Sequence, residues 1–565
     1  MKKLFLLFLL IPFIVNSQCV NNTTWDGNTW SNGFPDFATN AIIDGFYDTG
    51  NDGSIDCCSL SVTNQGSLTI NLGDYCNVYS NITIDPIGIL IVKSGGSLIP
   101  NNSSSISTGI VRIERKTPTL KRYDYTYWSS PVNTTIGSAL LPTKWEPSMT
   151  FTFYTPNFYD VETTYFGTFI SSVPDGQDDN QDAWIRTNIN DTMIPGKGYA
   201  SMVTSLNGTG TFPRTETVTF IGPLNVGNIS IPLDQSQNLT SSIDDYNLVG
   251  NPYSSAINSS DFIDANVNSI SGTLYFWTHT NTLTTSYSGL ALLNYSTNDY
   301  AKYTKLGGIT AVFGGKKPSN VVGSCQGFLV EAEGTSNTLI FSPSLMSKAY
   351  VNTTPVSFYR MNSYKNNLWL NMRNNQGLFS QQLIGYNQNT DLDYNKGWDS
   401  KLIDIRLALK FYSIENNIMY DIQSRGEFED DDLVQLGYFS AVNGQFTISI
   451  DSKEGEMRGK DIYLYDNSLD IWHNLSTPYS FSTIVGRFNN RFFISYKSPD
   501  EDDNDEMDDR MIRNLDKTKI EVYDIFGRHI QTINSDDFDN LPKKQILILK
   551  IYNEDKVITK KYFKL

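Results

Sequence analysis

The sequence predicts an all-β protein, and three observations support that fold class. Aromatic residues make up 13% of the 565 residues, and such residues are enriched in strands. Asn, Ser, Thr and Gly fill the gaps between short runs in which apolar and polar residues alternate, which is typical of strands joined by turns. Stretches with helical periodicity are few and short, and 399–409 is an example that suits a brief helix or a loop. At this length we expect several folding units.

The N-terminus has the pattern of a secretory signal peptide. Two lysines precede an apolar run from Leu4 to Val15, and small residues allow cleavage before Gln18. The run is too short to span a bilayer, and no later stretch is long and apolar enough to cross one. A lipid anchor on Cys19 is the alternative, although residues 16–18 lack the small and aliphatic set that such a signal needs. We therefore expect residues 1–17 to be removed and the mature chain, with no transmembrane segment, to be secreted or held at the outer cell surface.

The cysteines fit an exported protein. Four of the five lie close to the start of the mature chain, and these disulfide candidates are Cys19, Cys57, Cys58 and Cys76. One or two disulfides are expected there, but two of the candidates are adjacent, so the connectivity stays open. Cys325 is expected to be a small buried residue. A zinc site is the alternative, but paired CxxC units are missing.

Residues 18–115 repeat a simple phrase, as in "SLSVTNQGSLTI" and "DPIGILIV". A few alternating Leu, Ile or Val residues are followed each time by a turn, with glycines at Gly66, Gly88 and Gly96. Short strands at such regular spacing predict a β-solenoid, in which each coil buries its apolar residues against the next. An ordinary β-sandwich with tight hairpins is the alternative.

Three further segments follow in order before the tail. From "RKTPTLKRYDYTYWSSPV" onward, charged and aromatic residues replace the small apolar ones, which predicts a separate all-β domain at 116–354. The strand-turn-strand rhythm of 355–498, as in "VQLGYFSAVNGQFTISID", predicts a jelly-roll-like β-sandwich. The run "DEDDNDEMDDR" repels itself and predicts an acidic linker at 499–514. The tail, 515–565, alternates apolar and polar residues and predicts a small β-sandwich.

Charge and motifs exclude some functions and leave others open. The formal net charge is -17 and no basic stripe offsets it, so we expect no nucleic-acid partner. Neither a GxSxG turn nor a phosphate-binding loop occurs. A glycosidase needs two facing carboxylates, and among sixty acidic residues the sequence gives no reason to choose a pair. We name no catalytic or cofactor-binding residue.

One loop is a weak calcium candidate. The stretch "DGQDDNQD" places several carboxylates within a polar segment, and Ca²⁺ prefers such oxygen ligands. The candidate ligands are Asp175, Asp178, Asp179 and Asp182. An exposed loop without metal is the alternative, and we expect no other cofactor.

The tail resembles the C-terminal sorting domain of proteins exported by the bacterial type IX secretion system. The resemblance rests on "IEVYDIFGRHIQ", which has the strand-Asp-x-x-Gly-Arg turn of that family, and on the basic strand near the end of "ILILKIYNEDKVITKKYFKL". The matching residues are Tyr523, Asp524, Gly527, Arg528, Lys560 and Lys561. Physically, the glycine closes a hairpin between apolar strands. The pattern departs from the family after "LP" at 541–542, where "KKQILIL" replaces the usual Gly-x-Tyr.

The body is similar to large surface proteins that carry this sorting domain, with "YDYTYWSSPV", "NLVGNPYSSAI", "CQGFLV" and "RFNNRFFISY" in the same order. The resemblance implies recognition of the tail by the secretion machinery, export across both membranes, removal of the tail, and release or attachment to surface polysaccharide. We expect a non-enzymatic, adhesin-like protein that binds glycans or neighbouring surfaces. The alternative is an extracellular carbohydrate-active or other hydrolase, which requires an aromatic-lined cleft with two carboxylates.

Overall fold

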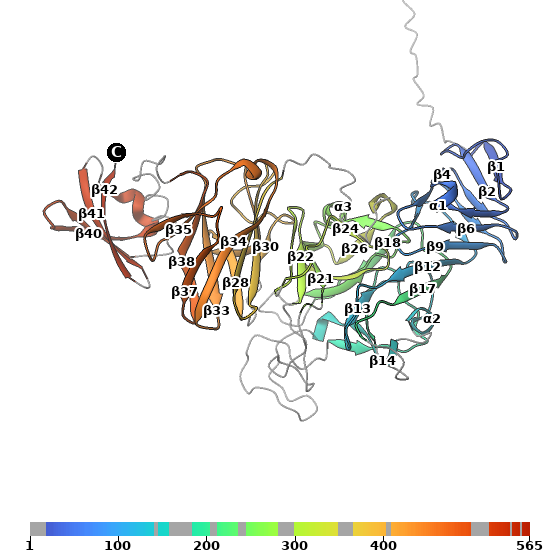
Figure 1. The fold of residues 1–565 in the computed structure, drawn as a ribbon, viewed down its shortest axis with the longest axis horizontal. Coiled ribbons are helices and arrows are strands. Elements are labelled where there is room, and N and C mark those ends of the chain that lie inside the picture. The colour runs from blue at the N-terminus through green and yellow to red at the C-terminus, as the bar shows by residue number, and fades with distance from the viewer. Residues whose placement is uncertain are drawn as a thin grey trace, which may run out of the picture.

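A computed structural model describes residues 19–140, 145–157, 183–203, 212–235, 245–278, 280, 299–312, 314–347, 365–402, 408–498, 519–542, 545–553 and 556–564. These residues form β-sheets that follow one another along an elongated molecule, with the N-terminal sheets at one end and the C-terminal sheet at the other (Figure 1). The predicted all-β fold is confirmed. The described helices are short and none is long and apolar enough to cross a membrane. They are α1 (Thr49–Asp52), α2 (Ile136–Leu140) and α3 (Ser259–Ala265), with 3-10 turns η1 (Thr155–Asn157), η3 (Pro343–Leu345), η4 (Gly455–Gly459) and η5 (Ser535–Asn540).

Residues 21–116 form a solenoid of parallel strands, as the repeated phrase predicts. The first wall contains β1 (Asn21–Trp25), β2 (Thr39–Ile43), β5 (Leu60–Val62), β8 (Ile82–Ile84) and β11 (Ser107–Thr108). The second contains β3 (Phe46–Asp48), β6 (Ser67–Ile70), β9 (Ile89–Val92) and β12 (Val111–Lys116), and the third β4 (Ile55–Cys57), β7 (Tyr75–Val78) and β10 (Ser97–Pro100).

Close stacking of the solenoid coils explains the glycines at the corners. A Cβ atom on Gly66 would lie 2.0 Å from the carbonyl oxygen of Ile43, and one on Gly88 would lie 2.7 Å from that of Thr63. A side chain at either corner therefore forces the neighbouring coils apart.

The solenoid continues into the next sheets without a break in its core. At its C-terminal end β12 pairs antiparallel with β17 (Thr217–Gly222), and Trp128 and Phe220 pack in the same apolar cluster as the solenoid interior. The predicted boundary between 115 and 116 falls inside β12.

Residues 125–347 form the middle unit. One sheet contains β13 (Tyr125–Trp128), β16 (Tyr199–Val203), β14 (Trp145–Phe153) and β15 (Trp184–Arg186). The central sheet contains β19 (Tyr246–Gly250), β25 (Gly327–Ala332), β21 (Ile270–Trp277), β22 (Tyr300–Tyr303) and β23 (Gly308–Ile309). Smaller sheets pair β18 (Ile229–Pro232) with β26 (Thr338–Phe341), and β20 (Ala256–Asn258) with β24 (Val321–Val322) and β27 (Met346–Ser347).

Residues 366–496 form a single sheet that curls around its own core, and we call it the curled sheet. Its order is β36 (Ile471–Asn474), β35 (Tyr463–Asp466), β38 (Gly486–Ser495), β33 (Leu433–Ser440), β31 (Leu409–Glu415), β32 (Ile418–Arg425), β29 (Phe379–Tyr386), β28 (Asn366–Asn374), β34 (Gly444–Lys453) and β37 (Tyr479–Thr483), with β30 (Ser400–Lys401) beside β32. Side chains join the two ends of this order. Tyr479 on β37 donates a hydrogen bond of 2.9 Å to Asp466 on β35, and Arg491 donates to the same carboxylate at 3.0 Å. The sheet is therefore nearly closed.

The tail folds as an antiparallel sheet, here called the C-terminal sheet, whose apolar face packs on the curled sheet. Its order is β40 (His529–Asn534), β39 (Lys519–Asp524), β41 (Gln545–Asn553) and β42 (Lys556–Lys564). Ile520 and Leu547 on its inner face share one apolar cluster with Tyr465 and Phe493 of the curled sheet. The small sandwich expected for the tail is thus made of one sheet of its own and one face of the preceding unit.

A hollow lined by carboxylates in the curled sheet

The interior of the curled sheet changes from apolar to polar toward one end. Ile384 on β29 and Leu436 on β33 lie in the apolar core. Farther along the core-facing positions, Glu415 ends β31 and Arg425 ends β32, and both line the same hollow. Strand alternation brings these charged side chains together because core-facing residues recur at every second position.

Arg425 is the centre of this polar end. Its Nε and Nη2 atoms donate to the two carboxylate oxygens of Asp432, at 2.6 and 2.8 Å, and its Nη1 donates to Glu415 at 2.8 Å. The guanidinium side chain is only 3% exposed. Burial opposes its charge, but Asp432 and Glu415 together outweigh that cost and raise the pKa of Arg425 above its usual value. The bidentate geometry fixes the loop that follows β32 onto the end of the sheet.

Two tyrosines complete this end of the core. The hydroxyl of Tyr386 donates to Asp432 at 2.7 Å and lies 2.9 Å from the hydroxyl of Tyr496. Burial, with the neighbouring Tyr496 and Asp432, raises the pKa of Tyr386 well above its usual value. The phenol therefore stays protonated and acts as a hydrogen-bond donor.

Tyr386, Arg425 and the two carboxylates paired with that arginine form one wall of a hollow with a volume of about 480 Å³. Its described lining carries more acid than base, because Arg425 is the only cation among the residues that line it. The lining residues are Tyr386, Thr390, Asp391, Leu392, Glu415, Arg425, Gly426, Glu427, Glu429, Asp431, Asp432 and Leu433. Such a hollow attracts cations, and its carboxylates can accept hydrogen bonds from hydroxyl groups of a sugar. Sequence reasoning did not single out these residues, although "SRGEFEDDD" places an arginine directly before an acidic loop.

The layer next to these charges contains polar groups without partners. Gln423, in register with the core residue Ile384, and Ser413, in register with the core residue Leu436, are at most 1% exposed. Neither the amide of Gln423 nor the hydroxyl of Ser413 makes a hydrogen bond within the described chain. Groups of this kind are commonly satisfied by buried water.

The comparison with protein families covers this whole body. Residues 17–496 match the family model described as a domain of unknown function, DUF8693. The chain belongs to the DUF8693 family. The matched residues include the solenoid, the middle unit and the curled sheet with its hollow, and they end before the C-terminal sheet. No curated protein and no solved structure matches the chain.

Several buried carboxylates of the DUF8693 region have raised pKa values. Burial, with the nearby Glu333, raises the pKa of Glu331 to about 7, and burial raises the pKa of Asp399 to about 6. Asp399 accepts hydrogen bonds from the backbone and hydroxyl of Ser424, so it has a structural role within the curled sheet, where it fixes the segment before β30 to β32. Burial also raises the pKa of Asp124 to about 6, within the middle unit.

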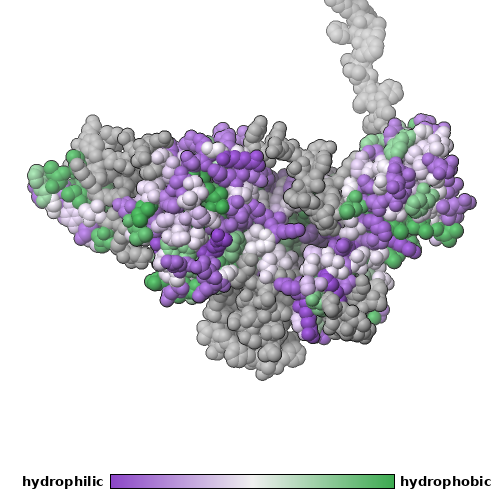
Figure 2. All heavy atoms as spheres, viewed as in Figure 1, coloured by the Kyte–Doolittle hydropathy of each residue, from purple (hydrophilic) through white to green (hydrophobic). Residues whose placement is uncertain are grey.

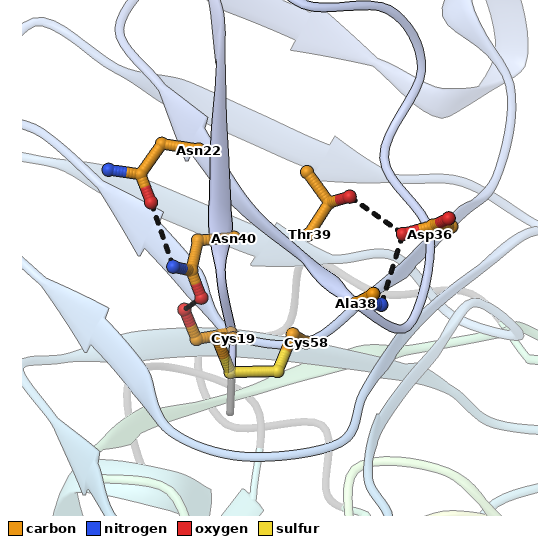
Figure 3. Close-up of a disulfide and its surroundings, with 8 residues drawn as sticks. Cys19, Asn22, Asp36, Ala38, Thr39, Asn40 and Cys58 are labelled. Carbon is orange, nitrogen blue, oxygen red and sulfur yellow. Dashed lines mark hydrogen bonds between the residues drawn. A yellow bond between two sulfur atoms is a disulfide. The ribbon is translucent and has the colours of Figure 1, made fainter. Parts of the chain in front are cut away.

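The N-terminal end of the DUF8693 region contains one disulfide. Cys19 is bonded to Cys58 with the Cα atoms 5.6 Å apart, next to the hydrogen-bonded pair Asn22 and Asn40 (Figure 3). This bond ties the residues before β1 to the coil that begins after β4. Cys57 and Cys76 are buried free thiols in the solenoid core, and Cys325 is a buried free thiol, as expected.

The predicted calcium loop lies outside the described residues, as do Asp175, Asp178, Asp179 and Asp182. Among the residues that are described, no group of three or more His, Cys, Asp or Glu side chains is arranged to hold a metal ion.

The predicted sorting residues form a tight hairpin turn between β39 and β40. The Asp524 side chain accepts backbone hydrogen bonds from Phe526 and Arg528, each at 2.9 Å, and pairs with the Arg528 side chain at 2.6 Å. Gly527 has φ +77°, which favours glycine. Tyr523 lies in β39 directly before Asp524, the last residue of that strand. The turn needs Asp, Gly and Arg at this spacing for its own geometry.

The other two sorting candidates lie far from the turn in sequence. Lys560 and Lys561 lie in β42, where Lys561 is in register with Ile548. The tip of the turn is apolar and exposed, with Phe526 78% exposed, and Figure 2 shows apolar residues gathered at the outer end of the C-terminal sheet.

Proposed function

We propose that this chain is a secreted or cell-surface protein exported by the type IX secretion system, and that it acts as a non-enzymatic, adhesin-like protein that binds glycans or neighbouring surfaces. The observation that carries the proposal is the hairpin turn of the C-terminal sheet, where Asp524, Gly527 and Arg528 have the arrangement that the sorting-domain pattern requires. The signal-peptide pattern at residues 1–17 and the Cys19–Cys58 disulfide support an exported protein. The secretion machinery is then the partner of the tail.

The body supports the adhesin-like part of the proposal. The solenoid and the sheets that follow it make an elongated structure (Figure 1), and stacked β-units supply length without catalytic groups. The acid-lined hollow is the place where we expect a hydroxyl-rich glycan to bind, because carboxylates there accept hydrogen bonds from sugar hydroxyls.

Export is tested in a host that carries the type IX system, by mass spectrometry of the medium and the cell envelope. The full chain is compared with a chain that ends at residue 514 and with the exposed-site control Lys519→Gln. We expect the control to reach the exterior without its signal peptide and its tail, and the shortened chain to stay inside the outer membrane. Unchanged delivery of the shortened chain would refute the sorting proposal.

Glycan binding is tested on an array with the purified full chain. We expect binding that falls at least tenfold when Glu427 and Glu429 are changed together to Gln, because these carboxylates line the hollow. Binding that is absent, or unaffected by these changes, would contradict the assignment of the hollow.

The hollow also favours a second candidate, an extracellular hydrolase. Glu415 and Asp432 are two carboxylates that line one cavity on either side of Arg425, and glycoside hydrolysis uses such pairs. Turnover of a polysaccharide by the purified chain, abolished by Glu415→Gln with binding retained, would favour the hydrolase over the adhesin.

A further inference from the structure

The outer face of the curled sheet carries a row of apolar and aromatic side chains across adjacent strands. Phe493 on β38 pairs in register with Tyr465 on β35, and Tyr465 pairs with Trp472 on β36. The rings of Tyr465 and Trp472 have centroids 4.7 Å apart. Leu433 on β33 adds to this row, which we call the aromatic row. These side chains point away from the core of the curled sheet, because their neighbours in sequence, Leu464, Val434, Phe492 and Ile494, belong to that core.

The C-terminal sheet covers the aromatic row. Phe493 is 0% exposed and Tyr465 is 2% exposed, although both lie on the outer face. They share one apolar cluster with alternate residues of β39 and β41 and with one residue of the loop between β40 and β41; these tail residues are Ile520, Val522, Leu547, Leu549, Ile551 and Leu541. The buried tail strands β39 and β41 therefore form an interface with an apolar centre, as in stable protein–protein contacts.

The opposite face of the C-terminal sheet is polar and self-contained. Glu521 accepts hydrogen bonds from Tyr523 and Tyr552, and it pairs with Lys519 at 2.7 Å. A lone sheet with one apolar and one polar face must bury its apolar face to be stable. Within the described chain, the aromatic row is what buries it.

We propose that the aromatic row is a docking surface for the C-terminal sheet, and that this sheet remains bound to the body after the segment 499–518 that joins them is cut. The proposal rests on the proposed function, because it concerns the step at which an exported tail is removed. The exposed hairpin turn at Asp524 lies outside the docking face, so a partner can contact the turn while the sheet is docked. Cutting the joining segment and releasing the tail are then two separate events.

The test uses the full chain with a specific protease site placed within 499–518. After complete cutting at micromolar concentration, size-exclusion chromatography and mass spectrometry report whether the two pieces elute together. We expect co-elution. Separation of the pieces immediately after cutting, with the body still folded by circular dichroism, would overturn the proposal.

Matched variants locate the interface. Phe493→Glu places a charge in the aromatic row on the body side, so the tail sequence is unchanged, and we expect the tail to dissociate at least ~10-fold faster, as loss of a central aromatic anchor predicts. Glu521→Gln, on the polar face of the same sheet, should leave co-elution unchanged. If Phe493→Glu behaves like Glu521→Gln, the aromatic row is not the docking surface.

The outcomes separate this proposal from the proposed function. Co-elution together with normal export of a chain that ends at residue 514 would refute the sorting role and keep the docking. Separation together with export that still needs the tail would refute the docking and keep the sorting role.

Discussion

Replacing Arg425 by Met tests whether the ion pairs at the hollow hold the curled sheet together. The guanidinium is 3% exposed, whereas its partners Glu415 and Asp432 are 15% and 20% exposed. Breaking a buried pair by removing one partner costs about 3–5 kcal/mol, because the other charge is left without compensation. The two carboxylates reach solvent in part, so we expect the low end of that range, about 3 kcal/mol.

Hydrogen exchange followed by mass spectrometry on the full chain measures this loss locally. A loss of about 3 kcal/mol speeds exchange of protected amides about 100-fold. We expect the faster exchange in β31, β32 and the loop 426–432, and unchanged exchange in the solenoid. Because the chain has several units, a single unfolding free energy is a poor readout, and exchange by peptide avoids it.

Lys460→Met is the matched control for Arg425→Met. Lys460 pairs with Asp430 of the same acidic loop at 2.5 Å, but these side chains are 33% and 51% exposed. Exposed pairs contribute at most about 1 kcal/mol, so exchange should change less than about tenfold. If Arg425→Met and Lys460→Met have equal small effects, the buried ion pairs do not hold the loop and the reasoning from burial is refuted.

Two further predictions concern titration and cysteine chemistry. The pKa of Glu331 is raised to about 7 from 4.5, so its protonated form favours folding, and this contribution is complete below pH ~4.5 and lost as the pH rises through ~7. Glu331→Gln should therefore stabilise the middle unit by about 3 kcal/mol at pH 8 and not at pH 4. Hydrogen exchange of peptides from β25, compared between the variant and the unchanged chain at each pH, measures this effect, and equal effects at the two pH values would contradict the assignment. Alkylation without reductant should label three cysteines in denaturant and none in the native chain, because Cys57, Cys76 and Cys325 are buried free thiols. Intact mass measures the number of labels. A single label in denaturant would indicate a second disulfide.

Local patterns in the sequence predicted the solenoid well. The turns at Gly66 and Gly88 are local features, and the physical reason for them, close stacking of coils, follows from the repeat itself. The hairpin turn at Asp524 was predictable from the sequence for the same reason, because its hydrogen bonds join residues at most four positions apart.

Contacts between distant segments were not predictable in the same way. Alternation marked Ile520 and Leu547 as one apolar face, but it does not say that Phe493 of the preceding unit covers that face. Cys19 is bonded to Cys58 and not to the adjacent Cys57. Cys57 is the last residue of β4 and packs in the solenoid core, whereas Cys58 follows the strand. The sequence does not reveal where that strand ends, so it left the pairing open. The hollow brings together residues of four strands and two loops, so no single motif encodes it.

The contact between the middle unit and the curled sheet decides whether the body acts as one stiff piece. Lys302 on β22 forms an ion pair with Asp421 on β32, and Trp369 donates through its indole nitrogen to the backbone oxygen of Gly308 at 2.8 Å. The backbone N–H of Gly397 also donates to the carbonyl oxygen of Ser271 at 3.2 Å. Hydrogen bonds from both backbone and side chains fix the orientation of one unit relative to the other more firmly than an apolar contact alone does.

The closest approach in this contact gives the sharpest test of stiffness. Gly272 has φ +91°, and a Cβ atom there would lie 2.3 Å from the Cα of Gly397. Gly272→Ala therefore forces the two units apart locally and also puts alanine into a strained backbone conformation. Gly377 also has a positive φ, but open space surrounds it, so Gly377→Ala adds the same backbone strain without a clash. Small-angle scattering of the full chain should show a broader distribution of distances for Gly272→Ala than for Gly377→Ala. Identical scattering profiles would mean that the observed contact does not set the shape of the body.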